Sequence, residues 1–180
     1  ELLFWTDRNL PKMHNQKIYD SMPYYAGKAD VLRYELLYQF GGLYSDGESY
    51  CVKAIEPLID DLECFGMTGN GGHVCNATLG CTPKHPAFRR VVYGLEPHIE
   101  KLRKKPRKEG YRIHNVSGGR YITPILIADP SFVQIEKGKA MGSRRLICHE
   151  SEKCEDTYIC HFHDASWKNE ASVKEEKIQI

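Results

Sequence analysis

The sequence lacks long hydrophobic runs and any strong excess of charge of one sign. Of its 180 residues, 41% are hydrophobic and 27% are charged, but the formal net charge is +1. No stretch approaches the roughly 20 apolar residues of a membrane-spanning helix, and no signal-peptide pattern opens the chain. A basic run, Lys101 to Lys108, lacks the interleaved aromatic residues typical of single-strand binding. We therefore predict no membrane span in this chain and no nucleic-acid partner.

Two common catalytic and metal-binding patterns are also absent. No Gly-x-Ser-x-Gly sequence occurs, so the nucleophile elbow of an α/β hydrolase is excluded. The seven cysteines form no Cys-x-x-Cys pair, although several cysteines and histidines lie close together between Cys148 and His163. A structural zinc site in that stretch is a competing hypothesis, because thiolate and imidazole suit zinc. The odd count and irregular spacing favour reduced thiols instead.

The length and the apolar patterns predict one layered α/β domain. A chain of 180 residues can bury a single sizeable core. Predicted helices cover residues 28–40 and 86–102, and predicted strands cover 2–5, 43–45, 62–67, 122–127, 131–135 and 158–160. Alternating strands and helices are typical of α/β folds. Residues 168–180 are polar and are expected to form a C-terminal tail.

One local pattern leads from a helix through two glycines into an acidic turn. Apolar residues recur at helical spacing from Lys28 to Phe40, and Gly41-Gly42 suits the left-handed turn that ends a helix. A short extended segment then reaches Asp46-Gly47-Glu48. Alternate residues of an extended chain point the same way, and magnesium or manganese prefers carboxylates together with substrate phosphates. This turn is therefore either a metal site or a solvated acidic loop.

The preceding helix carries a second pair of charged residues. Asp30 and Arg33 stand three positions apart and therefore share one helix face. An aspartate could accept hydrogen bonds from sugar hydroxyls, and an arginine could fork onto hydroxyl or phosphate oxygens. A surface ion pair explains the same spacing, so both alternatives remain open from the spacing alone.

Residues 29–48, which read ADVLRYELLYQFGGLYSDGE, resemble the signature of glycosyltransferase family 32. The last acid of the family's Asp-x-Asp motif is Glu48 here. Asn76, followed by Pro83-Lys84-His85-Pro86, is similar to the family's next conserved segment, and Ser117-Gly118-Gly119 is similar to its Thr-Gly-Pro turn, with Gly119 in place of proline. His161 precedes Ser166-Trp167 by five and six positions, as in the family's C-terminal pattern.

The resemblance implies a single GT-A-like (Rossmann-like) nucleotide-sugar-binding domain over residues 1–167, with a mixed central sheet flanked by helices. The implied catalytic residues are Asp30, Arg33, Asp46 and Glu48. The implied donor-binding residues are Tyr44, Asn76, Ser166 and Trp167. The implied metal ligands are Asp46, Glu48 and His161, with His161 preferred over His163.

The resemblance implies a metal-dependent, retaining glycosyltransferase with Mn²⁺ or Mg²⁺ as its cofactor. It would move a hexose from a UDP- or GDP-linked donor to a glycan, lipid or protein acceptor. The alternative is a catalytically weak or inactive sugar-nucleotide- or glycan-binding relative, motivated by Glu48, by Gly119 and by the missing His-x-x-Trp strand of the family. With no anchor in the sequence, a soluble cytoplasmic protein is favoured, although a clipped Golgi enzyme has the same features.

Overall fold

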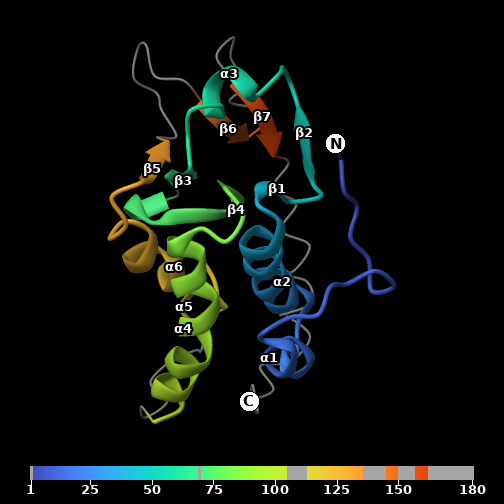
Figure 1. Ribbon diagram of the computed structural model, residues 1–180, viewed down its shortest axis with the longest axis vertical. Helices are drawn as coiled ribbons and strands as arrows, with labels where there is room; N and C mark the ends of the chain where they lie inside the picture. Colours follow the sequence, from blue (N-terminus) through green and yellow to red (C-terminus); the bar gives the residue numbers. More distant parts are fainter. Residues whose placement is uncertain (1, 69, 105–112, 136–144, 150–156, 162–180) are drawn as a thin grey trace.

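The computed structural model describes residues 2–68, 70–104, 113–135, 145–149 and 157–161. These residues stack in three layers (Figure 1). Helices form the lower layer, a four-stranded sheet crosses the middle, and a three-stranded sheet lies above it with a short helix, α3 (Glu56–Ile59). None of the described helices combines the length and hydrophobicity needed to cross a lipid bilayer.

The central sheet is mixed. Its strand order is β1-β4-β3-β5, with bounds Gly42–Ser45, Val74–Cys81, Cys64–Thr68 and Phe132–Ile135. Strands β1 and β3 run antiparallel to β4, whereas β5 runs parallel to β3. The predicted strands at 43–45, 62–67 and 131–135 are confirmed as β1, β3 and β5. The predicted α/β class, with a mixed central sheet flanked by helices, is confirmed as well.

The upper sheet brings the C-terminal part of the described chain back to the acidic turn. Its order is β2-β7-β6, with bounds Ser49–Cys51, Thr157–His161 and Arg145–His149. β2 is antiparallel and β6 is parallel to β7. The predicted strand at 158–160 is confirmed as β7, and its last residue, His161, is the register partner of Ser49. This pairing places His161 beside the residue that follows Glu48.

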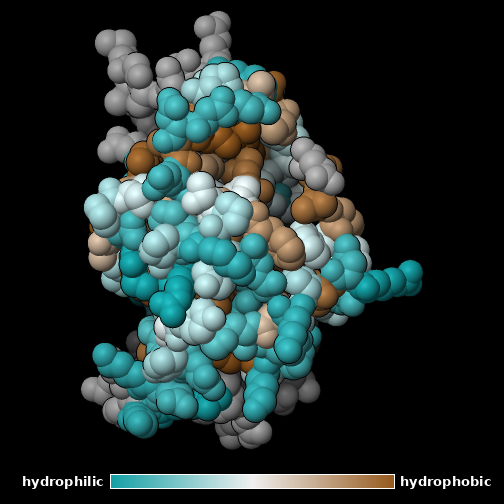
Figure 2. All heavy atoms as spheres, in the orientation of Figure 1, coloured by the Kyte–Doolittle hydropathy of each residue, from teal (hydrophilic) through white to brown (hydrophobic). Residues whose placement is uncertain are grey.

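The lower layer contains α1 (Gln16–Ser21), α2 (Tyr25–Phe40), α4 (Pro86–Arg103), α5 (Ile113–Val116) and α6 (Gly119–Leu126). The predicted helices at 28–40 and 86–102 are confirmed as α2 and α4. One core lies between these helices and the central sheet; its fully buried side chains include Tyr34, Leu37, Leu79, Phe88, Leu95, Ile122 and Leu126. A smaller core lies between the two sheets and contains Phe65, Met67, Ile135 and Ile159. Figure 2 shows hydrophobic surface near this second core, between α3 and the central sheet.

The junction between α2 and β1 depends on a glycine. Gly41 caps α2 with φ of 69°, and its N–H bonds to the Leu37 carbonyl at 2.9 Å. A Cβ at this position would lie 2.6 Å from the backbone nitrogen of Pro83. Both the left-handed backbone and this close approach exclude a side chain. The predicted glycine turn is therefore confirmed, and it sends the chain directly into β1, the strand that precedes Asp46.

Two sequence predictions are wrong. Residues 2–5 form no strand, and the side chains of Leu2, Leu3 and Phe4 are exposed. The Asn9 side chain donates to the Phe4 carbonyl and accepts from the Thr6 N–H. No described strand pairs with residues 2–5, and hydrophobic side chains alone do not make a strand without a neighbouring strand to pair with. The stretch 122–127 forms the end of helix α6 and its C-cap, Ile127, and not a strand. Its buried positions follow helical spacing and pack against β4 and α4.

The start of β5 is tied to the start of α4 by a polar link. His85, the N-cap of α4, accepts from the Ala87 N–H through Nδ1, and its Nε2 lies 3.0 Å from the Ser131 hydroxyl. Asp129 accepts from the Ser131 N–H at 3.0 Å and pairs with Arg90. The hydrogen bond from the Ser131 side chain lowers the pKa of Asp129 to about 2; burial acts in the opposite direction, and Arg90 adds to the lowering.

We expect Asp129→Asn to destabilise the fold at neutral pH by about 1 kcal/mol. The pKa of Asp129 is depressed in the folded state, so its carboxylate stabilises the fold above the ordinary value of 3.8, and this contribution disappears as the pH falls towards about 2. Urea unfolding at several pH values measures it, with the exposed Asp61→Asn as the control. If the loss of unfolding free energy in Asp129→Asn stayed constant down to pH 2, it would not come from the lowered pKa of Asp129.

Candidate active site

The predicted site residues from four different elements meet where the central sheet approaches the upper sheet. Asp30 and Arg33 lie on α2, Tyr44 on β1 and Asn76 on β4. Asp46 and Glu48 lie in the turn between β1 and β2, and His161 ends β7. Register explains part of this convergence, because Ser45, which precedes Asp46, pairs with Thr78 on the strand that carries Asn76.

Arg33 is the hub of the site and is 5% exposed. Its Nε donates to the Ala29 carbonyl at 3.1 Å, one NH group lies 3.3 Å from Asp30 Oδ1, and the other lies 3.1 Å from Asp46 Oδ1. The same guanidinium donates to the Asn76 backbone carbonyl and stacks 4.6 Å from the Tyr44 ring centroid. The predicted proximity of Asp30 and Arg33 on one helix face is confirmed, and the alternative of a surface ion pair is excluded by their burial.

The electrostatics of this cluster favour the charged guanidinium. Burial by itself lowers the pKa of Arg33, but Tyr44, Asp30 and Asp46 together raise the pKa well above its ordinary value. Burial also raises the pKa of Tyr44, so its phenol stays protonated and donates to Asp46 Oδ1 at 2.9 Å. One oxygen of Asp46 is thereby contacted both by a fixed cation and by a fixed hydroxyl.

Asp30 is held by two residues from distant places in the chain. Its Oδ1 accepts from Asn76 Nδ2 at 2.6 Å, and its Oδ2 accepts from the Ser117 hydroxyl at 2.8 Å. Asn76 Nδ2 also lies 3.3 Å from the Tyr34 hydroxyl, which donates to the Ser117 carbonyl at 2.6 Å. No role was predicted for Tyr34 and Ser117, since both are ordinary core residues by pattern. The similarity of residues 117–119 to a family turn, with Gly119 in place of proline, was the one available signal.

The two acids of the turn face the same imidazole. His161 Nε2 lies 3.5 Å from Asp46 Oδ2 and 3.3 Å from Glu48 Oε1. Burial tends to raise the pKa of Asp46, but the contact with His161, the charge of Arg33 and the hydrogen bond from Tyr44 together lower it. The side chains of Asp46 and Glu48 are 26% and 27% exposed, whereas those of Asp30 and Arg33 are 7% and 6% exposed. The acids are therefore the part of the cluster that solvent reaches.

Asp46, Glu48 and His161 together offer two carboxylates and one imidazole, which are suitable ligand types for a divalent cation such as Mn²⁺ or Mg²⁺. Within the described ranges, however, no group of three or more His, Cys, Asp or Glu side chains is arranged so that it could hold a metal ion. Asp46, Glu48 and His161 lie together, but metal ligation by them stays a prediction.

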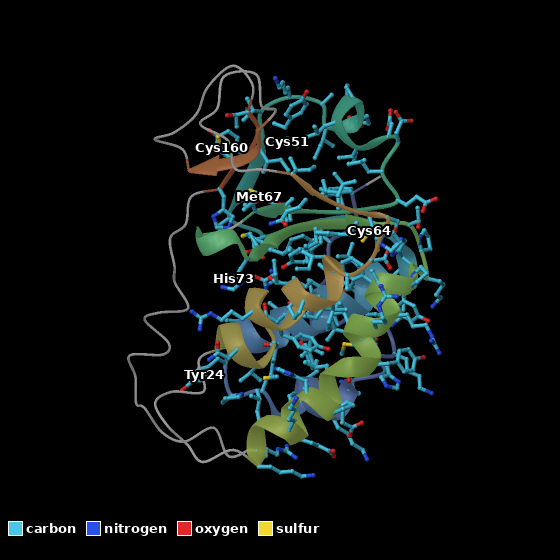
Figure 3. All side chains as sticks on the ribbon, turned by 90° about the vertical axis from the view of Figure 1, so that its left-hand side faces the viewer. Tyr24, Cys51, Cys64, Met67, His73 and Cys160 are labelled. Atoms are coloured by element: carbon cyan, nitrogen blue, oxygen red, sulfur yellow. The ribbon has the colours of Figure 1, made fainter. Side chains whose placement is uncertain are left out.

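Other predictions fall partly or wholly outside the described residues. Ser166, Trp167 and His163 lie outside them, as does most of the stretch behind the zinc hypothesis. The described cysteines, which are Cys51, Cys64, Cys75, Cys81 and Cys160, are all free thiols. Figure 3 shows Cys51 and Cys160 on the upper sheet, apart from Cys64 at the far end of the central sheet.

Gly119, which replaces the expected proline, has a structural explanation. A Cβ at this position would lie 2.5 Å from the carbonyl oxygen of Val74, the first residue of β4. The N-terminus of α6 therefore touches the backbone of the strand that carries Asn76. Any side chain here would push α6 away from the site.

Comparison with known proteins finds similarity to glycosyltransferases. Residues 4–64 match the model of the glycosyltransferase sugar-binding region containing a DXD motif. Inositol phosphoceramide mannosyltransferase 3 of Schizosaccharomyces pombe is 33% identical over 103 residues, which cover 53% of this chain and 28% of that protein. The mannosyl phosphorylinositol ceramide synthase CSH1 of Saccharomyces cerevisiae is 30% identical over 105 residues, which cover 55% of this chain and 27% of that protein. This chain therefore spans less than a third of the length of these relatives.

Two further similarities extend beyond the matched region. The uncharacterized glycosyltransferase L373 of Acanthamoeba polyphaga mimivirus is 23% identical over 156 residues, which cover 84% of this chain and 61% of that protein. The solved structure of the PaToxG glycosyltransferase aligns with a TM-score of 0.45 and 19% identity, covering 58% of this chain and 35% of that one. The segment that matches the model of the DXD-containing sugar-binding region, residues 4–64, contains Asp30, Arg33, Asp46 and Glu48.

Proposed function

We propose that this chain is the donor-binding part of a metal-dependent, retaining glycosyltransferase that uses a nucleotide-diphosphate sugar. The observation that carries the proposal is the buried guanidinium of Arg33, held between Asp30 and Asp46 and beside Asn76. A fixed cation next to solvent-accessible carboxylates suits a ligand that contains both hydroxyls and a diphosphate.

The difference in exposure between the buried and the more exposed residues of the site suggests a different role for each group. Arg33 and Asn76 would orient the hexose, since both are fixed by Asp30 and neither can rotate without losing hydrogen bonds. Asp46 and Glu48, with His161, would hold Mn²⁺ or Mg²⁺ at the more exposed edge of the cluster. There the ion would neutralise the charge that develops on the departing nucleoside diphosphate.

Glu48 is compatible with this role despite its longer side chain. Its Oε1 and Asp46 Oδ2 lie at similar distances from His161 Nε2, 3.3 and 3.5 Å. The additional methylene therefore leaves the Glu48 carboxylate in contact with the imidazole that Asp46 also faces. This observation favours an active enzyme over the alternative of an inactive sugar-nucleotide-binding relative.

The relatives suggest which substrates to test first. Several are named inositol phosphoceramide mannosyltransferase or mannosyl phosphorylinositol ceramide synthase. We therefore propose mannose as the first sugar and an inositol-phosphate lipid as the first acceptor class to test.

The transferase proposal predicts nucleotide release that depends on both the metal and Asp46. Wild-type protein, assayed with a panel of UDP- and GDP-sugars, should release nucleotide from one donor with Mn²⁺ and lose this activity in EDTA. Asp46→Asn should lower the rate by at least about 100-fold, because it removes a charge that faces the leaving diphosphate. The exposed Asp61→Asn is the matched control and should keep full activity. Binding of a donor without release would support the inactive relative instead, and neither binding nor release would reject the proposal.

The metal assignment predicts a difference between two substitutions of Glu48. Glu48→Gln removes the charge and should weaken Mn²⁺ binding about tenfold or more, whereas Glu48→Asp keeps a carboxylate and should change it by less than about threefold. Water-proton relaxation in the presence of a nucleoside diphosphate measures Mn²⁺ binding without turnover. Equal Mn²⁺ affinity in Glu48→Gln and wild type would remove Glu48 from the ligand set.

A further inference from the structure

Ser117 lies far from the acidic motif in sequence but contacts the site through two different groups. It precedes α6, is fully buried, and donates its hydroxyl to Asp30 Oδ2 at 2.8 Å. Its carbonyl accepts from the Tyr34 hydroxyl at 2.6 Å. Both contacts reach α2, so this single residue connects the α5–α6 turn to the helix that carries Arg33.

The turn that carries Ser117 is itself fixed against β4. Gly119 lies so close to Val74 that a Cβ would be 2.5 Å from the Val74 carbonyl. Thr123, one turn further along α6, accepts from the Val74 N–H at 2.8 Å and donates to the Gly119 carbonyl. The close approach of Gly119 to Val74 therefore sets the position of Ser117 relative to the strand that bears Asn76, while the Thr123 hydroxyl stabilises the following turn of α6.

The two oxygens of Asp30 have different partners. Oδ2 receives the Ser117 hydroxyl, while Oδ1 receives Asn76 Nδ2 at 2.6 Å and lies 3.3 Å from an NH group of Arg33. Arginine and aspartate prefer a bidentate arrangement in which both carboxylate oxygens face the guanidinium. The Ser117 hydroxyl opposes this rotation, and it leaves the second NH group of Arg33 turned towards Asp46.

We propose that Ser117 is a positioning residue of the donor site. By holding one oxygen of Asp30, it prevents a bidentate Asp30–Arg33 pair and keeps Arg33 between Asp30 and Asp46. This inference rests on the proposed function for its effect on the donor, but its effect on Arg33 does not require catalysis. In Ser117→Ala, Asp30 rotates towards Arg33, and the guanidinium withdraws from Asp46 and from the Asn76 carbonyl.

The test compares Ser117→Ala with Thr123→Val. Both remove one hydroxyl that links α6 to its surroundings, but the Thr123 hydroxyl bonds to backbone groups of Val74 and Gly119 and not to Asp30. We expect Ser117→Ala to raise the donor KM about tenfold, with kcat changing less. Thr123→Val should lower the melting temperature at least as much as Ser117→Ala while leaving the donor KM within about twofold of wild type.

A second readout separates this inference from the proposed function. The Arg33 Nε–H, which bonds to the Ala29 carbonyl, gives a side-chain NMR signal that Arg33→Lys identifies by its loss. In Ser117→Ala this signal should shift and exchange with solvent faster, and in Thr123→Val it should not. If wild type uses no donor but the signal responds in this way, the positioning role stands and the transferase proposal fails. An unchanged signal and an unchanged donor KM in Ser117→Ala, or equal effects in both variants, would overturn the inference.

Discussion

The site depends on one buried cation. Arg33 is almost fully enclosed, and a buried charge is strongly destabilising unless it is paired and hydrogen-bonded. Asp30, Asp46 and the Asn76 carbonyl supply that compensation from a helix, a turn and a strand. Losing any one of these partners leaves part of the Arg33 charge uncompensated. The contacts of this one guanidinium therefore stabilise the helix, the turn and the strand in one arrangement.

Short connections in the chain keep the partners of Arg33 in place. Gly41 turns the chain from α2 into β1 within one residue, so Arg33 and Asp46 are joined by a helix, a glycine turn and a four-residue strand. β1 is further fixed by its ladder to β4, which also carries Asn76. A longer connection would permit the helix and the acids to move separately and would weaken the preorganisation on which positioning of a ligand depends.

Local features of the site could be predicted from the sequence, whereas its long-range partners could not. Asp30, Arg33 and Asp46 lie within one helix-turn-strand unit, where helical spacing and glycine chemistry determine geometry. Ser117 joins this unit from 87 residues away through a hydrogen bond that no periodicity reveals. The strand predicted at 122–127 was wrong for a related reason: a short apolar run has no distinct strand signal, and packing against β4 and α4 decides in favour of a helix.

The arrangement of Arg33 and the acids also bears on how a metal could share the site. Asp46 Oδ1 faces Arg33 and Tyr44, whereas Asp46 Oδ2 faces His161. A cation bound through Oδ2 and Glu48 would therefore not have to displace Arg33, because the two positive centres would use opposite oxygens of one carboxylate. The two cations repel each other, and the single negative charge of Asp46 between them offsets this repulsion only in part. A diphosphate supplies further negative charge, so metal and nucleotide are expected to bind this site together more tightly than either does alone.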